Sequence, residues 1–225
     1  MQTEAEVPIH PANILPSITA KVFKRRGSLY AFPTLNPTKT ALVVVDLDMG
    51  TARDAPDVQQ IAENVNVLAA TLREHGGTVA WITTPIQKPT ENFKAVYGTA
   101  AADFEQKGQP GGQAYTLWPE LVPEEVDIRT TKLGSSAFFP GKCNLHDQLK
   151  AKDIESILVV GAVTNVCCEA SARDATELDY KVTIVSDAMV GLWPELNQAT
   201  LTTFFRWYGD VRITEDVIRL VGASR

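Results

Sequence analysis

Two adjacent cysteines, Cys167 and Cys168, have the clearest capacity for chemistry in this chain. They lie in the segment GAVTNVCCEASARDA (161–175), and the only other cysteine is Cys143. Such a pair could bind a metal, form a redox couple, supply a nucleophile beside a core residue, or simply pack. Adjacent cysteines lack the usual gap of about two to four residues between zinc ligands, and no second ligand pair follows. A bridge between neighbours would be strained, so a nucleophile beside a packed thiol is the favoured interpretation.

A cysteine nucleophile needs a group that takes its proton. Histidine is the common partner, but the three histidines are isolated and none follows a predicted strand: His10, His75 and His146. A thiol can instead be activated at a helix N-terminus, near a cation and a carboxylate. Thr164 or Asn165 can cap a helix predicted over 165–178, which places Cys167 in its first turn. Free N–H groups there would favour a thiolate and could bind an oxyanion.

The same predicted helix separates the two thiols. Neighbouring side chains on a helix point about 100° apart, so both cannot face one site. Cys168 aligns with Ala172 and Ala175, a stripe of small residues suited to close packing on a sheet. We therefore expect Cys167 to react and Cys168 to pack.

Alternating strands and helices predict the scaffold that positions these groups. Continuous apolar runs are typical of strands buried on both faces. The predicted strands are 40–48, 78–84, 126–132, 156–161, 181–187 and 210–214. The predicted helices are 57–74, 144–151, 165–178, 195–207 and a short C-terminal helix. This order indicates an α/β three-layer sandwich, with a mostly parallel, six-stranded, Rossmann-like sheet and helices on both faces.

Ligands of such sheets bind beyond the carboxyl ends of the strands. Asp46 lies at the end of the first predicted strand, Lys132 ends the third, and the segment of Cys167 follows the fourth. If the three side chains converge, the site contains a base, a cation and a nucleophile.

Two regions outside the predicted sheet have their own composition. Residues 1–38 contain five prolines and little periodicity, which predicts an arm laid over the domain or over a partner subunit. Residues 39–225 then form a single domain. Within it, residues 85–123 are rich in glycine and proline, and a connection of this length indicates a lid or binding loop.

Composition excludes several classes of protein. A net charge of −6 over 225 residues argues against binding to nucleic acid or to an anionic membrane. No run of about 20 apolar residues could span a bilayer, and the N-terminus lacks the features of a secretory signal. Three cysteines cannot form a disulfide framework, so we expect a cytoplasmic protein. No dinucleotide or phosphate-binding glycine motif is present, and no cofactor is predicted.

Three motifs together resemble the isochorismatase-like cysteine hydrolases. They read VVVDLD, TKLGSSAFFP and GAVTNVCCEASARDA, and the resemblance extends over roughly residues 38–215. It implies a catalytic triad of Asp46, Lys132 and Cys167. It also implies a non-proline cis peptide between Ala162 and Val163, with an oxyanion hole formed by the N–H groups of Val163 and Cys167.

The resemblance implies hydrolysis of a small amide, ureide or N-carbamoyl compound through a thioester on Cys167. Asp46 would act as base and Lys132 as cation. The alternatives are a vinyl-ether hydrolase of the isochorismatase type and a catalytically silent binding or scaffold protein. The resemblance and the proline-rich arm favour a homodimer or homotetramer.

Two departures from the family pattern concern the site. Asp48 stands where many members have glutamine, and a second carboxylate could raise the pKa of the base if both face the site. The nicotinamidase branch of the family binds a metal through an aspartate and histidines that follow its second strand. The corresponding segment here, WITTPIQKPTENFKAV, has no histidine, so no metal is predicted. Aromatic residues near the expected mouth are candidates for the substrate pocket: Trp81, Tyr97, Trp118, Phe138, Phe139 and Trp193.

Overall fold

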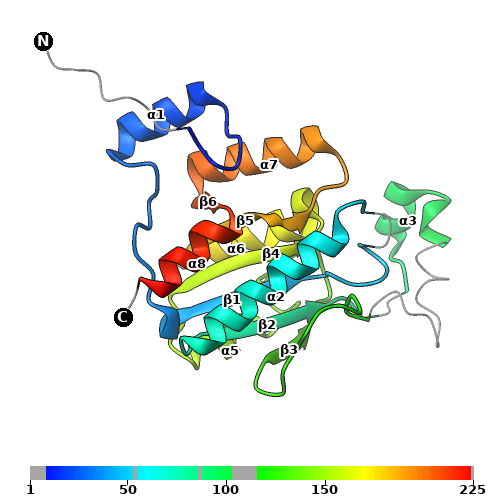
Figure 1. Ribbon diagram of the computed structural model, residues 1–225. Helices are drawn as coiled ribbons and strands as arrows, with labels where there is room; N and C mark the ends of the chain where they lie inside the picture. Colours follow the sequence, from blue (N-terminus) through cyan, green and yellow to red (C-terminus); the bar gives the residue numbers. More distant parts are fainter. Residues whose placement is uncertain (1–8, 53–54, 86–87, 103–115, 224–225) are drawn as a thin grey trace, which may run out of the picture.

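Parallel strands form the centre of the fold (Figure 1). In this computed structural model, the described residues are 9–52, 55–85, 88–102 and 116–223. The strands are β1 Thr40–Val45, β2 Thr78–Thr83, β3 Ile128–Thr131, β4 Ser156–Ala162, β5 Lys181–Val190 and β6 Asp210–Arg212. They form a six-stranded sheet in the order β3-β2-β1-β4-β5-β6, and every pairing between them is parallel. The predicted fold class is confirmed.

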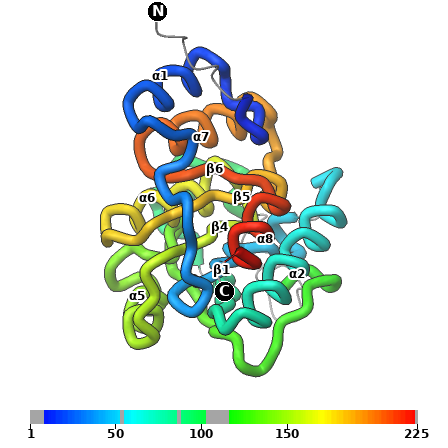
Figure 2. Tube along the Cα trace, turned by 60° about the vertical axis from the view of Figure 1, so that its left-hand side comes forward, coloured from blue at the N-terminus to red at the C-terminus, as the bar shows by residue number. Residues whose placement is uncertain are grey.

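Helices cover both faces of this sheet, which gives three layers (Figures 1 and 2). The helices are α1 Pro16–Arg26, α2 Val58–Glu74, α3 Glu91–Tyr97, α5 Leu145–Lys150, α6 Glu169–Glu177, α7 Pro194–Trp207 and α8 Thr214–Gly222. The helices α2 and α8 pack on one face, whereas α5, α6 and α7 pack on the other. No described helix combines the length and the apolar character needed to cross a membrane.

Burial on both faces explains the continuous apolar run in β1. Val43 and Val45 belong to the core beneath α5, α6 and α7. Leu42 and Val44 point the other way, into the core beneath α2 and α8. Successive side chains alternate between faces, so a strand covered on both sides needs apolar residues at every position.

The strand order places a natural ligand site beside β1. This strand pairs with β2 on one side and with β4 on the other, so the order of the chain reverses between β1 and β4. Connections leave the sheet in opposite directions at such a point and open a crevice at the carboxyl ends. Asp46 follows β1, and the segment of Cys167 follows β4.

The N-terminal arm contains the helix α1, which its proline content did not predict. Pro16 occupies the first helical turn, where its missing N–H costs no hydrogen bond. Gly27 ends the helix with φ of +77°, a conformation that favours glycine. The helix lies along α7 of the same chain (Figure 2). The described part of the arm therefore covers the domain itself, while the boundary at residue 38 stays a prediction.

A buried carboxylate, Asp210, fixes the arm to the sheet. Its two oxygens accept hydrogen bonds from the N–H groups of Ala31 and Phe32, at 2.7 and 2.9 Å. Arg26 and Arg212 approach the same carboxylate at 3.4 and 3.7 Å. The Asp210 side chain is completely buried, and these partners replace the contacts with water that it loses on folding.

We expect Asp210→Ala to lower the free energy of unfolding by about 3–5 kcal/mol, because it leaves two cations without their buried partner. Asp210→Asn is the matched control and should lose less, since its amide oxygen still accepts a backbone N–H. Urea denaturation of the three proteins measures the effect. A loss below about 1 kcal/mol for the alanine variant would contradict this role for Asp210.

The predicted lid, residues 85–123, is described in part. It contains α3, and it returns beside the end of β1, where Asp48 and Leu117 form an antiparallel bridge. The N–H of Met49 donates to the carbonyl of Thr116 at 3.0 Å. Residues 86–87 and 103–115 lie outside the described residues.

Candidate active site

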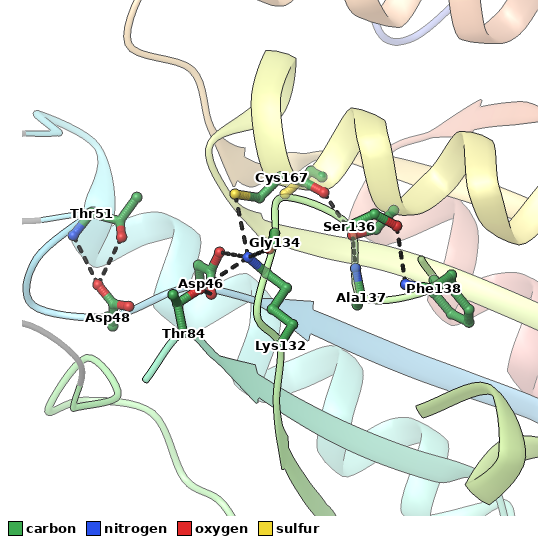
Figure 3. Close-up of polar contacts among 12 residues, drawn as sticks. Asp46, Asp48, Thr51, Thr84, Lys132, Gly134, Ser136, Ala137, Phe138 and Cys167 are labelled. Atoms are coloured by element: carbon green, nitrogen blue, oxygen red, sulfur yellow. Dashed lines mark hydrogen bonds and ion pairs between the residues drawn. The ribbon is translucent and has the colours of Figure 1, made fainter. Parts of the chain in front are cut away.

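Asp46, Lys132 and Cys167 converge at the carboxyl ends of the strands (Figure 3). The Nζ atom of Lys132 lies 2.6 Å from Oδ2 of Asp46 and 3.6 Å from Sγ of Cys167. Asp46 and Lys132 follow β1 and β3, which are separated in the sheet by β2. A lysine suits this position because its long side chain can cross the end of the intervening strand.

Thr84, at the end of β2, links the amine to the carboxylate. Lys132 donates to Oγ1 of Thr84 at 3.0 Å and to the carbonyl of Gly134 at 2.8 Å. The Thr84 hydroxyl in turn donates to Oδ1 of Asp46 at 3.1 Å. These bonds hold the ammonium group and the carboxylate in one orientation. Sequence reasoning missed Thr84, although its position just past a strand end is the signal that could have found it.

Unusual backbone conformations bring the strand ends together. Asp46 has φ of +44°, a left-handed conformation that aspartate tolerates better than most residues. Gly161 has φ of +115°, and a Cβ atom there would lie 2.1 Å from the carbonyl oxygen of Val45. Only glycine allows β4 to approach β1 this closely.

The loop after β4 presents Cys167 to the site. The predicted cis peptide between Ala162 and Val163 is present. The next residues, Thr164–Cys168, form a single π-helical turn before α6 begins at Glu169, so the helix starts with a wider turn than predicted. The Thr164 hydroxyl donates to the carbonyl of Val190 at 2.9 Å and fixes this turn to β5. An oxyanion hole formed by Val163 and Cys167 stays a prediction.

The resting site favours a neutral thiol. Burial, the charge of Asp46 and a hydrogen bond with that carboxylate raise the pKa of Cys167 to about 12, although Lys132 opposes the shift. Burial alone would lower the pKa of Lys132, but the charges of Asp46 and Cys167 outweigh it, and the pKa is raised. These effects oppose the predicted thiolate in the resting site, while the contribution of the helix N-terminus stays a prediction. The ion pair of Asp46 and Lys132 therefore stands beside a thiol whose pKa is raised.

Cys168 packs in the core, as the helical geometry predicts. Its side chain is fully buried with Ala172 and Ala175 against the sheet, and its Sγ lies 3.8 Å from the carbonyl oxygen of Val160. Cys167 instead lines a cavity. The two thiols thus face different surroundings.

That cavity has a volume of about 650 Å³, which suits a small organic molecule. Of the predicted pocket residues, Tyr97 lines it. The other candidates are not among the described lining residues: Trp81, Trp118, Phe138, Phe139 and Trp193. Trp118 instead packs partly buried against the core beneath α2 and α8.

The pocket predictions for Trp81 and Phe138 are wrong because these side chains point into the core, whereas those for Phe139 and Trp193 stay predictions. Trp81 points into the core beneath α2, and its Nε1 donates to Oδ2 of Asp127 at 2.7 Å. Phe138 packs in the opposite core. Phe139 and Trp193 are more than half exposed, at 54% and 63%.

Several lining residues were missed by sequence reasoning. Phe93 of α3 stacks on Tyr97 with ring centroids 4.1 Å apart, and both line the cavity. Val166 and Leu192 add apolar surface from the segments that follow β4 and β5. The spacing of four residues between Phe93 and Tyr97 on one helical face was the available signal.

Asp48 also lines the cavity and is almost fully buried, with 1% of its surface exposed. Its Oδ1 accepts hydrogen bonds from the N–H groups of Gly50 and Thr51, at 2.9 and 2.8 Å, and from the Thr51 hydroxyl at 2.8 Å. Burial raises the pKa of Asp48 to about 6, and the charge of Asp46 adds to this shift, although the three donors oppose it. The structure therefore places a second carboxylate in the site.

The raised pKa of Asp48 predicts a pH-dependent cost in stability. Between about pH 4 and pH 6 the folded protein holds a proton that the unfolded chain releases, so stability falls as the pH rises through this window. Asp48→Asn removes the charge but keeps the acceptor. We expect this variant to be more stable than the native protein by up to about 3 kcal/mol at pH 8, and by little at pH 4. Urea denaturation at both pH values tests this, and a less stable variant at pH 8 would contradict it.

Among the described residues, no group of three or more His, Cys, Asp or Glu side chains is arranged to hold a metal ion. The described charged residues that line the cavity are Asp46, Asp48, Lys88 and Lys132. Because the thiol of Cys167 and the ion pair of Asp46 and Lys132 line one cavity, the site suits nucleophilic attack on a carbonyl carbon.

Comparison with known sequences gives one consistent family. Residues 40–216 match the family described as Isochorismatase domain. The chain is 30% identical over 188 residues to the uncharacterized isochorismatase family protein YwoC of Bacillus subtilis (strain 168), and the match covers 81% of this chain and 94% of that protein. It is 27% identical over 209 residues to the ureidoacrylate amidohydrolase RutB of Cronobacter sakazakii, with coverage of 80% and 88%.

Solved structures agree with the sequence matches. A cysteine hydrolase from Pseudomonas syringae pv. phaseolicola 1448A superposes with a TM-score of 0.76 at 25% identity, over 87% of this chain and 98% of that one. The fold is also that of N-carbamoylsarcosine amidase from Thermoplasma acidophilum, with a TM-score of 0.64 at 22% identity and coverage of 79% and 97%. The chain belongs to the isochorismatase family of hydrolases.

Proposed function

We propose that this protein is a cysteine-dependent hydrolase of a small amide, ureide or N-carbamoyl compound. The observation that carries the proposal is the contact of Lys132 with both Asp46 and Cys167 at the floor of a cavity of small-molecule size. The sequence likeness to the amidohydrolase RutB supports the same reaction class.

In the proposed first step, Asp46 accepts the thiol proton while Sγ of Cys167 attacks the carbonyl carbon. The N–H groups of Val163 and Cys167 bind the oxygen that becomes negative. The carbon–nitrogen bond then breaks, and Asp46 returns the proton to the leaving nitrogen. The products of this step are an amine or ammonia and a thioester on Cys167.

Water completes the reaction. Asp46, again ionised, takes a proton from a water molecule that attacks the thioester carbon. The carbon–sulfur bond breaks, the acid leaves, and the proton returns to sulfur. Lys132 offsets the charge of Asp46 when the carboxylate is ionised, and stabilises the thiolate when the carboxylate holds the proton.

The direct test is release of ammonia from a panel of small amides, ureides and N-carbamoyl amino acids by purified, folded protein. We expect turnover of at least one class. Failure over the whole panel would contradict the proposal. Hydrolysis of a vinyl ether that persists in Cys167→Ala would instead favour the isochorismatase-type reaction, which does not need the thiol.

We further propose that the protein assembles as a homodimer or homotetramer. Exposed apolar side chains support this, among them Leu192, Trp193 and Leu196 near the start of α7. Light scattering of the purified protein would measure the assembly state.

A further inference from the structure

The second carboxylate of the cavity has a free hydrogen-bonding position. Asp48 is 1% exposed, yet its three described donors all contact the same oxygen, Oδ1. Figure 3 shows the two donors of Thr51. Oδ2 is left for another donor. Oδ2 is not one of the fully buried side-chain atoms that lack a partner, so it is open to the cavity that Asp48 lines, where a donor from the substrate can reach it.

The charges of the site favour a cation at this position. Among the described charged residues of the lining, Lys132 forms an ion pair with Asp46, and these two charges offset each other. Lys88 is exposed to solvent, where its charge is screened. Among the residues that the structure describes, Asp48 therefore supplies the uncompensated charge of the buried part of the cavity.

A purely structural role for Asp48 does not need this charge. The turn formed by Gly50 and Thr51 uses only Oδ1, and an asparagine would provide an equivalent oxygen. The residue is nevertheless a carboxylate, in a buried position that disfavours its ionised form. With a pKa of about 6, it is mostly ionised at pH 7 and can pair with a cation there.

We propose that Asp48 is a specificity-determining residue that binds an ammonium group of the substrate through Oδ2. The preferred substrates are then small amides or ureides that carry a cationic amine, rather than those that carry a carboxylate. Asp48 and the reactive centre share one cavity, and the charge of Asp46 acts on Asp48, so the ammonium group must lie close to the scissile carbonyl. The inference rests on the proposed hydrolase function of this site.

Three amides of equal chain length test the proposal by hydrolysis: β-alaninamide, butanamide and succinamate. They end in an ammonium group, a methyl group and a carboxylate. We expect kcat/KM to be highest for β-alaninamide. Asp48→Asn should lower that value by roughly 10- to 100-fold, the usual worth of a hydrogen bond to a charged group, and change butanamide by less than about threefold.

Binding to Cys167→Ala separates this inference from the hydrolase proposal. Calorimetry at pH 7.5 should show β-alaninamide binding more tightly than succinamate, and adding Asp48→Asn should abolish that preference. Lowering the pH to 5 should weaken β-alaninamide binding when Asp48 is present and have little effect without it. Asp46, Lys132 and Lys88 also face the cavity, and the Asp48→Asn comparison removes their contribution.

The outcomes are distinct. Preferential binding of β-alaninamide without hydrolysis by the native enzyme would support the role of Asp48 and contradict the hydrolase proposal. If the protein hydrolyses the three amides and Asp48→Asn leaves these rates unchanged, the result would support the hydrolase proposal and contradict the role of Asp48. Equal binding of the cationic and anionic probes, or binding of neither, would overturn the assignment of Asp48.

Discussion

Cys167→Ala is expected to lower kcat/KM for amide hydrolysis by at least about 10,000-fold, because covalent attack has no substitute once the thiol is gone. The fold should persist. Cys167 lies on a cavity wall, so removal of its sulfur leaves no closed void in the core. Ammonia release over a range of substrate concentrations below KM measures kcat/KM, and circular dichroism with thermal unfolding measures the fold.

The adjacent cysteine supplies a matched control. Cys168→Ala removes an equally large sulfur one residue away, but from a fully buried position. We expect this variant to keep activity within a few fold and to lose about 1–2 kcal/mol of stability through the cavity it creates. Cys167→Ala should therefore lose activity and keep its stability, whereas Cys168→Ala should keep its activity and lose stability. Equal losses of activity in both would contradict the division of roles between the thiols.

Asp46→Asn is expected to change hydrolysis and thiol reactivity in opposite directions. Loss of the general base should lower kcat/KM by about 100- to 10,000-fold. Burial, the charge of Asp46 and its hydrogen bond raise the pKa of Cys167, whereas Lys132 lowers it. Without the carboxylate, Lys132 is opposed by burial alone, so the thiolate fraction at pH 7.5 should increase, and alkylation by iodoacetamide should speed up by at least about tenfold.

Peptide-resolved mass spectrometry can follow this alkylation. Cys143, which is partly exposed, provides an internal reference whose rate should not change. Lys132 loses its buried partner in this variant, so unfolding must be monitored under the same conditions. Slower alkylation of Cys167 in folded Asp46→Asn would show that the carboxylate is not what holds the thiol protonated.

The sheet could be predicted from sequence because its strands are covered on both faces. This environment requires long apolar runs, such as TALVVV in β1, and such runs are easily recognised. The helix α1 escaped prediction because it lies at the surface of the domain, with only Thr19 and Val22 buried. Its periodic signal was too short to stand out among the flanking prolines.

The convergence of the site could also be predicted, since strand ends of a parallel sheet share one edge. The positions of Asp46, Lys132 and the segment of Cys167 along the chain were enough to predict that they lie together. The pocket walls could not be predicted this way. Trp81 lies in β2, which is covered on both faces, so its side chain enters a core whichever face it takes. Phe138 and Phe139 lie in the irregular segment after β3, where no periodic pattern indicates which side chain is buried.

The protonation state of Cys167 was beyond sequence reasoning for a different reason. A helix N-terminus and a lysine both favour a thiolate, and both are visible as sequence features. The opposing effects are burial and a carboxylate within hydrogen-bond reach, which exist only in the folded site. The relative size of these effects decides the outcome, and only the assembled structure determines it.

Mass spectrometry of the enzyme quenched with acid during turnover tests the central claim most directly. With an amide or ureide that the protein hydrolyses, we expect the mass of the acyl group on Cys167 and on neither Cys143 nor Cys168. Hydroxylamine should remove it, as it removes thioesters. Steady turnover that persists in Cys167→Ala, or an acyl group that maps to another residue, would contradict the account.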